Sequence, residues 1–176
     1  MYSCLIQDSV VYIRDSSGAV SEQTLAMLEP MLDADDGVQQ LSKYQVLCRT
    51  GWTQFGAVLR RKLWEVEPLY QIKTRSGQVS LTGQHTLPVR RGMEELVVPA
   101  SAVRAGDSLL VLDKPKLGKK APPLGEQMAF RPYGVLESRK YTGYEGNVYQ
   151  VDTEDGTLVV NGLLVSCSGS SWELPK

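Results

Sequence analysis

Short apolar runs separated by glycine-containing turn signals fill most of this chain, and this alternation restricts its fold more than any other feature. The runs are rich in β-branched and aromatic residues, which is typical of strands. They lie at residues 9–14, 44–49, 57–62, 69–74, 79–82, 87–90, 95–99, 108–112, 133–141, 148–153 and 158–165. Strands of this number and spacing predict a mainly β domain, barrel-like or sandwich-like.

One segment, residues 21–32, has the pattern of a helix instead. Ser21 can cap its first turn, and Leu25, Leu28 and Leu32 would share one face. Pro30 should stop or kink the helix just before its last turn. Residues 33–37 then read as a solvated loop, and the Lys- and Pro-rich residues 114–125 as an exposed, mobile loop.

Composition excludes several kinds of site. The formal charge is −1, whereas binding to nucleic acid needs a basic surplus or stripe. The chain has one histidine, His85, and three cysteines without a metal-ligand spacing, so we expect no metal site and no disulfide framework. No apolar run is long enough to span a membrane, and we expect no cofactor.

Three short motifs carry residues with chemistry. Cys4 begins Cys-Leu-Ile-Gln-Asp-Ser-Val, Thr82 precedes His85 by three positions, and an Asn-Gly hairpin leads to a final apolar strand that ends on Ser166 and Cys167. Taken singly each motif is ordinary: a lone cysteine is usually a small buried hydrophobe, and a lone histidine is usually structural.

Together, and in this order, the motifs resemble those of the Hint superfamily, which comprises inteins and the autoprocessing domain of hedgehog proteins. The Cys4 segment resembles the N-terminal splice motif, and Thr82-x-x-His85 resembles the second motif. Residues 105–110, Ala-Gly-Asp-Ser-Leu-Leu, resemble a strand entry of many members, and residues 148–165 resemble the C-terminal pair of strands. The resemblance implies a compact, horseshoe-like Hint fold of many short strands with one inserted helix.

The resemblance also implies an intramolecular reaction. Cys4 would attack the carbonyl of Ser3 and convert the Ser3–Cys4 peptide bond into a thioester. His85 would protonate the leaving nitrogen, and Thr82 would hold the scissile amide. One basic residue from Arg60, Arg61 or Lys62 would stabilise the oxyanion.

The C-terminal motif departs from that of a splicing intein. An intein ends in His-Asn before Cys, Ser or Thr, and those two positions here are Ser166 and Cys167. The Ser-Cys ending resembles the hedgehog type, in which only the N-terminal bond is cleaved. Cys167 would then lie beside Cys4, where it would accept the acyl group or lock Cys4 in a disulfide, with Ser166 in support. A mini-intein with an altered or degenerate ending remains the alternative, because Cys4-Leu5 is more intein-like.

The implied organisation is a flank stub at residues 1–3, a processing domain at 4–167 with a helical insert at 16–53, and a flank at 168–176. The substrate would be the flanking polypeptide, the second nucleophile an external or internal thiol, and the molecule a monomer that reacts once. Two readings from other classes stay open: a β-barrel binding module, and a Cys-His hydrolase that acts on other molecules. A Cys-His hydrolase would need a partner to orient His85, and the sequence offers no clear carboxylate or carboxamide for that role.

Overall fold

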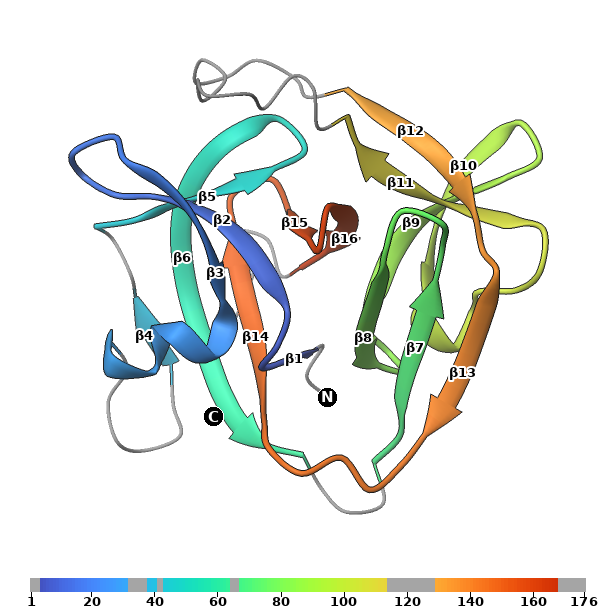
Figure 1. The fold of residues 1–176 in the computed structure, drawn as a ribbon, viewed down its shortest axis with the longest axis horizontal. Helices are drawn as coiled ribbons and strands as arrows, with labels where there is room; N and C mark the ends of the chain where they lie inside the picture. The colour runs from blue at the N-terminus through green and yellow to red at the C-terminus, as the bar shows by residue number, and fades with distance from the viewer. Residues whose placement is uncertain (1–3, 32–37, 41–42, 64–66, 114–128, 168–176) are drawn as a thin grey trace.

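The protein is described here from a computed structural model, which covers residues 4–31, 38–40, 43–63, 67–113 and 129–167. Over these residues the chain is mainly β, and its strands form two sheets. Figure 1 shows a horseshoe-like arrangement in which two curved arms face each other and β1 lies between them. The predictions for residues 33–37, 114–125 and both flanks concern segments outside the described residues.

The larger sheet contains ten strands in the order β13-β7-β8-β1-β14-β6-β5-β2-β3, with β4 paired to β6. Its strands are β1 (Leu5–Ile6), β2 (Val10–Arg14), β3 (Val20–Thr24), β4 (Val38–Gln40), β5 (Gln45–Cys48), β6 (Gly51–Lys62), β7 (Leu69–Lys73), β8 (Gln78–Thr82), β13 (Glu137–Tyr141) and β14 (Asn147–Thr153). All pairings are antiparallel. The short strand β1 therefore joins the two arms at the centre of this sheet.

The smaller sheet contains six strands in the order β10-β9-β11-β16-β15, with β12 paired to β11. Its strands are β9 (Thr86–Arg91), β10 (Glu94–Pro99), β11 (Asp107–Leu112), β12 (Phe130–Gly134), β15 (Thr157–Val160) and β16 (Leu163–Ser166). A short 3-10 helix, η2 (Ala100–Ala102), follows β10. The last strand, β16, thus packs beside strands from the middle of the chain.

The helix predicted at residues 21–32 is wrong in its first part. Residues 21–24 belong to β3, which pairs with β2 over its whole length, and only a 3-10 helix, η1 (Leu25–Met31), follows. A helix from Ser21 would reach Pro30 within about ten residues, which is too short to be stable without strong packing. In the β2–β3 hairpin, the backbone groups of residues 20–24 form hydrogen bonds with those of β2 instead. The segment 16–53 is therefore largely strand, although Leu25 and Leu28 are buried as their shared face predicts.

Two strand predictions change in extent. The run at residues 133–141 divides into β12 and β13, and β6 begins six residues before the predicted start at Ala57. The long strand β6 pairs with β5 in its first half and with β14 in its second half. Gly56 lies where β14 has a bulge, and a Cβ there would come within 2.8 Å of the Asp152 carbonyl oxygen. This close approach lets one strand serve both pairings.

Buried apolar side chains from both sheets form one large core and one smaller cluster. Leu5 of β1 and Tyr149 of β14 both belong to the large core and are fully buried. Within the described residues, no helix is long and apolar enough to cross a membrane. The core therefore fixes β1, next to Cys4, at the centre of the fold.

Candidate functional site

Cys4 stands directly before β1, and its position is fixed from both sides. Leu5 pairs with β8 on one side and with β14 on the other, and Cys4 is fully buried. The Cys4 N–H donates to Thr82 Oγ1 at 3.0 Å, and the Thr82 N–H donates to the Cys4 carbonyl at 3.0 Å. The Thr82 hydroxyl thus binds the nitrogen of the Ser3–Cys4 peptide bond.

A tight turn after β8 carries His85 back toward Cys4. The His85 N–H donates to the Thr82 carbonyl at 3.0 Å, while Ala100 of η2 donates to the His85 carbonyl at 2.9 Å. Gly83 allows the turn to pack closely, because a Cβ at this position would lie 2.8 Å from Cε2 of Tyr70. The two residues between Thr82 and His85 form a single tight turn. This turn brings the Thr82 hydroxyl and the His85 imidazole to the Cys4 side of the fold.

The imidazole of His85 is buried, and its Nε2 lies 2.5 Å from the Ser166 carbonyl oxygen. A carbonyl can only accept, so Nε2 carries the proton in this contact. Nδ1 is buried and has no hydrogen-bond partner among the described residues. Burial lowers the pKa of His85, and the backbone of Ser166 and of Cys4 opposes that effect. A neutral ring with a bare lone pair on Nδ1 is the resulting form.

Of the three basic candidates, Arg61 lies at the thiol of Cys4. Burial raises the pKa of the Cys4 thiol to about 11, while the charge of Arg61 and a hydrogen bond from it pull that pKa down. Glu67 holds the Arg61 guanidinium through two contacts, of 2.8 and 2.6 Å. The Glu67 charge in turn raises the pKa of the thiol. Arg61 is therefore a cation held in place at the predicted nucleophile.

The other two candidates are elsewhere. Arg60 is buried in an ion pair with Glu29 of η1, which also accepts a hydrogen bond from the Tyr149 hydroxyl. Lys62 is exposed at the end of β6. Because side chains alternate along a strand, Arg61 faces away from both neighbours. The oxyanion role predicted for Lys62 or Arg60 is not supported by these positions.

Cys167 follows β16, and its thiol is hydrogen-bonded to a neighbouring strand. Its Sγ lies 3.0 Å from Thr153 Oγ1, and the Thr153 hydroxyl donates to the Thr157 carbonyl at 2.8 Å. That hydroxyl proton is already used, so the Cys167 thiol is the donor to Thr153. Burial raises the pKa of this thiol to about 12. Cys4, Cys48 and Cys167 are all free thiols.

This geometry can be compared with known proteins. No family model and no curated protein matches the chain. Among solved structures, an intein from a hyperthermophile aligns with a TM-score of 0.75 and 13% identity, covering 93% of this chain and 99% of that one. The transcription factor IIB Mvu mini-intein aligns with a TM-score of 0.71 and 13% identity, covering 94% and 99%. A KlbA intein precursor from Methanococcus jannaschii aligns with a TM-score of 0.70 and 16% identity, covering 100% and 97%.

The chain has the Hint fold. This confirms the fold expected from the order of the motifs, over nearly the whole length of each of these inteins. Their identity to this chain is low, so the likeness establishes the fold alone.

Two groups at the site were not predicted from the sequence. Glu67 positions Arg61, and the only signal for it is an opposite charge shortly after the basic run at residues 60–62. The Ser166 carbonyl binds His85, and a backbone group leaves no signal in a sequence. The sequence offers no clear carboxylate or carboxamide to orient His85, whereas the structure supplies an acceptor from the main chain.

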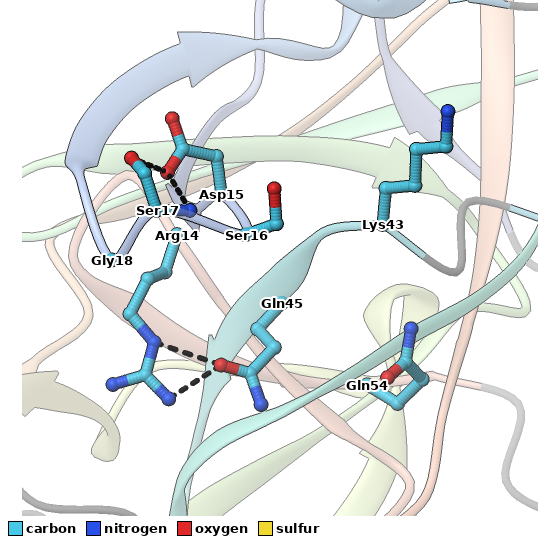
Figure 2. A pocket seen from close by; sticks show the side chains of 8 residues that line it. All are labelled: Arg14, Asp15, Ser16, Ser17, Gly18, Lys43, Gln45 and Gln54. Atoms are coloured by element: carbon cyan, nitrogen blue, oxygen red, sulfur yellow. Dashed lines mark hydrogen bonds between the residues drawn. The ribbon is translucent and has the colours of Figure 1, made fainter.

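One pocket among the described residues lies away from the residues of the Cys4 site. Arg14, Asp15, Lys43 and Gln45 line it, and the Arg14 guanidinium donates to Gln45 Oε1 (Figure 2). It shares no residue with the Cys4 site, which is buried. Among the described residues, no group of three or more His, Cys, Asp or Glu side chains could hold a metal ion.

Proposed function

We propose that this Hint domain cleaves its own chain at the Ser3–Cys4 bond through an N–S acyl shift. The proposal is carried by the hydrogen bond on the Cys4 nitrogen together with the nitrogen of His85 that is unpaired within the described residues. Thr82 Oγ1 binds the scissile nitrogen at 3.0 Å, and the buried lone pair of His85 Nδ1 is without a hydrogen bond among the described residues. The Hint fold adds to this support, because the inteins above share it.

The proton balance of the step follows from the form of His85. The Cys4 thiol transfers its proton to Nδ1 as Sγ attacks the Ser3 carbonyl carbon, and the ring becomes an imidazolium. The new C–S bond forms, the C–N bond breaks, and Nδ1 returns the proton to the departing nitrogen of Cys4. The products are a thioester on Cys4 Sγ and a free amino group on the same residue. No net proton is gained or lost.

Arg61 supports the charge that appears during this step. Its guanidinium lies at the thiol, so it stabilises the thiolate that attacks and the oxyanion that forms beside it. Glu67 limits the gain in reactivity, because its charge opposes that of Arg61 at the sulfur. This arrangement keeps Cys4 protonated at rest while a cation is ready for the transition state.

We assign the second step to a thiol from solution, which takes the acyl group from Cys4 and releases residues 1–3 as a new thioester. This is the hedgehog-like outcome suggested by the Ser166-Cys167 ending. Cys167 is the internal candidate for the same role. Cys167 is half-buried and its thiol donates to Thr153, so it must first lose that hydrogen bond and its proton. An external thiol has no hydrogen bond to Thr153 to break before it attacks.

Protein splicing is the second candidate function. It is favoured by the similarity to inteins, and it fits the fold as well as cleavage does. The position that would hold the cyclising Asn is Cys167 here, which has no carboxamide to attack the next peptide bond.

The proposal is tested by incubating the purified chain with dithiothreitol or hydroxylamine and following its intact mass. We expect loss of residues 1–3 from the wild type and no loss from Cys4→Ala or His85→Ala. Cys48→Ala is the matched control, because the buried Cys48 thiol donates a hydrogen bond to the Gly51 carbonyl and takes no part in the site. A full-length mass for the wild type in every thiol, with Cys4 in its reduced form, would refute the proposal.

Splicing is tested with a longer C-terminal flank attached to Lys176. A ligated product of the two flanks would establish splicing, whereas release of the N-terminal flank alone would establish cleavage.

A further inference from the structure

The orientation of His85 depends on the last strand of the domain. Among the described residues, the Nε2 of His85 is hydrogen-bonded to the Ser166 carbonyl, and Nδ1 has no hydrogen-bond partner. These two residues are 81 positions apart in the chain. Cys4, whose backbone also contacts the ring, stands directly before the first strand. One imidazole is therefore in contact with the backbone of both ends of the domain.

The Ser166 carbonyl is itself held in place. The Cys167 N–H donates to the Gly156 carbonyl at 2.8 Å, and Ser166 pairs with Thr157 across the β15–β16 hairpin. The three residues that precede Ser166 in β16 are fully buried. The carbonyl reaches this position only when β16 is docked in the smaller sheet.

We propose that Ser166 is a positioning residue whose carbonyl makes the reactivity of His85 conditional on the docking of β16. The proposal rests on the acyl shift described above and adds a control to it. A neutral imidazole has two tautomers and two ring orientations, and its reactive nitrogen is set by the hydrogen bond that the other nitrogen makes. With β16 absent from the sheet, the ring would lose the acceptor of its Nε2 proton, and the Cys4 backbone alone would remain in contact with it. Cleavage of the first bond therefore waits until the last strand has folded.

The hydrogen bond can be observed directly because His85 is the only histidine in the chain. Full-length Cys4→Ala protein, which does not process, is labelled with ¹⁵N in histidine and ¹³C in the backbone carbonyls. We expect a protonated Nε2, a bare Nδ1, and a through-bond coupling between Nε2 and the Ser166 carbonyl carbon. A protonated Nδ1, or the absence of that coupling at a temperature where β16 amides are protected from exchange, overturns the proposal.

The dependence of cleavage on β16 is tested with two variants of the full chain at one position. Cys167→Pro removes the N–H that donates to Gly156 and restricts Ser166, so it displaces the Ser166 carbonyl. Cys167→Ala lacks the same thiol but keeps the N–H, so it is the reference. We expect thiol-induced loss of residues 1–3 to be at least about tenfold slower in Cys167→Pro, given the usual contribution of an acid–base group.

The outcomes separate the two proposals. Equal cleavage rates in Cys167→Pro and Cys167→Ala overturn the conditional role of Ser166 and leave the acyl shift intact. No cleavage in the wild type overturns the acyl shift, and the conditional role with it. To exclude a folding defect, the slower rate counts as support only if the amide spectrum of Cys167→Pro keeps the signals of the larger sheet and the His85 coupling is lost.

Discussion

His85 shows how one residue changes its chemistry on burial. A histidine in water titrates near neutral pH, which is why the sequence suggests it as a proton donor. In the fold its pKa is lowered, chiefly by burial, so the ring is neutral at pH 7. In the proposed acyl shift, His85 therefore acts first as a base toward the thiol and only then as an acid toward the leaving nitrogen.

Thr82 is the residue on which the ground-state geometry of Cys4 depends. We predict that Thr82→Val slows thiol-induced cleavage by about tenfold or more, because it removes the acceptor of the buried Cys4 N–H. The same change should lower the free energy of unfolding by about 1–3 kcal/mol. Cleavage assays and urea unfolding of Thr82→Val beside Thr82→Ser measure both effects. Equal rates in the two variants would show that the hydroxyl has no role.

Arg61 provides a prediction about pH. We predict that Arg61→Gln raises the pKa of Cys4 above its value of about 11, because the nearby cation favours the thiolate. The rise of cleavage rate with pH should then shift to higher pH. Lys62→Gln removes the same charge from the exposed neighbour and should leave the profile unchanged. A shift of similar size in both variants would point to net charge instead of the contact with Cys4.

Among the elements, the turn between β15 and β16 also connects the C-terminal hairpin to two other strands. Asn161 has a φ of 54°, in the left-handed region, and Gly162 follows with a φ of 78°. The Asn161 carboxamide accepts from the Val10 N–H at 2.8 Å and donates to the Gln78 carbonyl at 2.8 Å. The C-terminal hairpin is thereby tied to the starts of β2 and β8.

We predict that Asn161→Ala lowers the free energy of unfolding by about 2–4 kcal/mol, because it loses both side-chain hydrogen bonds and strains the left-handed backbone. Asn161→Gly keeps the backbone conformation and loses only the hydrogen bonds, so it should be less destabilised. Urea unfolding of the two variants measures the difference. Identical stabilities would mean that the positive φ carries no cost here.

For the whole molecule, the buried neutral His85 links folding to pH. Its pKa is below 6.5 in the folded protein and 6.5 in the unfolded chain, so the unfolded chain binds a proton first as the pH falls. The contribution of neutral His85 to the stability of the fold is fully present above pH 6.5. It is lost as the pH falls from 6.5 to the lower pKa of the folded protein. We predict that stability falls with pH in this window by up to about 1.4 kcal/mol per pH unit from this group.

His85→Gln is the variant that isolates this contribution, since glutamine does not titrate. The difference in stability between wild type and His85→Gln should shrink as the pH is lowered from 6.5. Parallel stability curves for the two proteins, measured by urea unfolding between pH 5 and 8, would contradict a lowered pKa of His85.

The strands were largely predictable because their pattern is local. Apolar runs such as the predicted residues 108–112 and 148–153 need only their own composition and flanking turns to be recognised, and each strand begins one residue earlier in the structure. The helix predicted from Ser21 was wrong because its competitor was not local: β2 lies before the turn at Asp15, and pairing with it used the backbone of residues 20–24.

The order of residues along the chain is enough to predict the strand content, the order of the motifs and Cys4, Thr82 and His85 as candidates. Only the tertiary structure decided that Arg61, and neither Arg60 nor Lys62, lies at the thiol, that Glu67 holds it, and that the Ser166 carbonyl orients His85. The physical reason is the range of each interaction. Side-chain type and spacing are written along the chain, whereas strand faces, burial and main-chain acceptors arise when distant segments pack together.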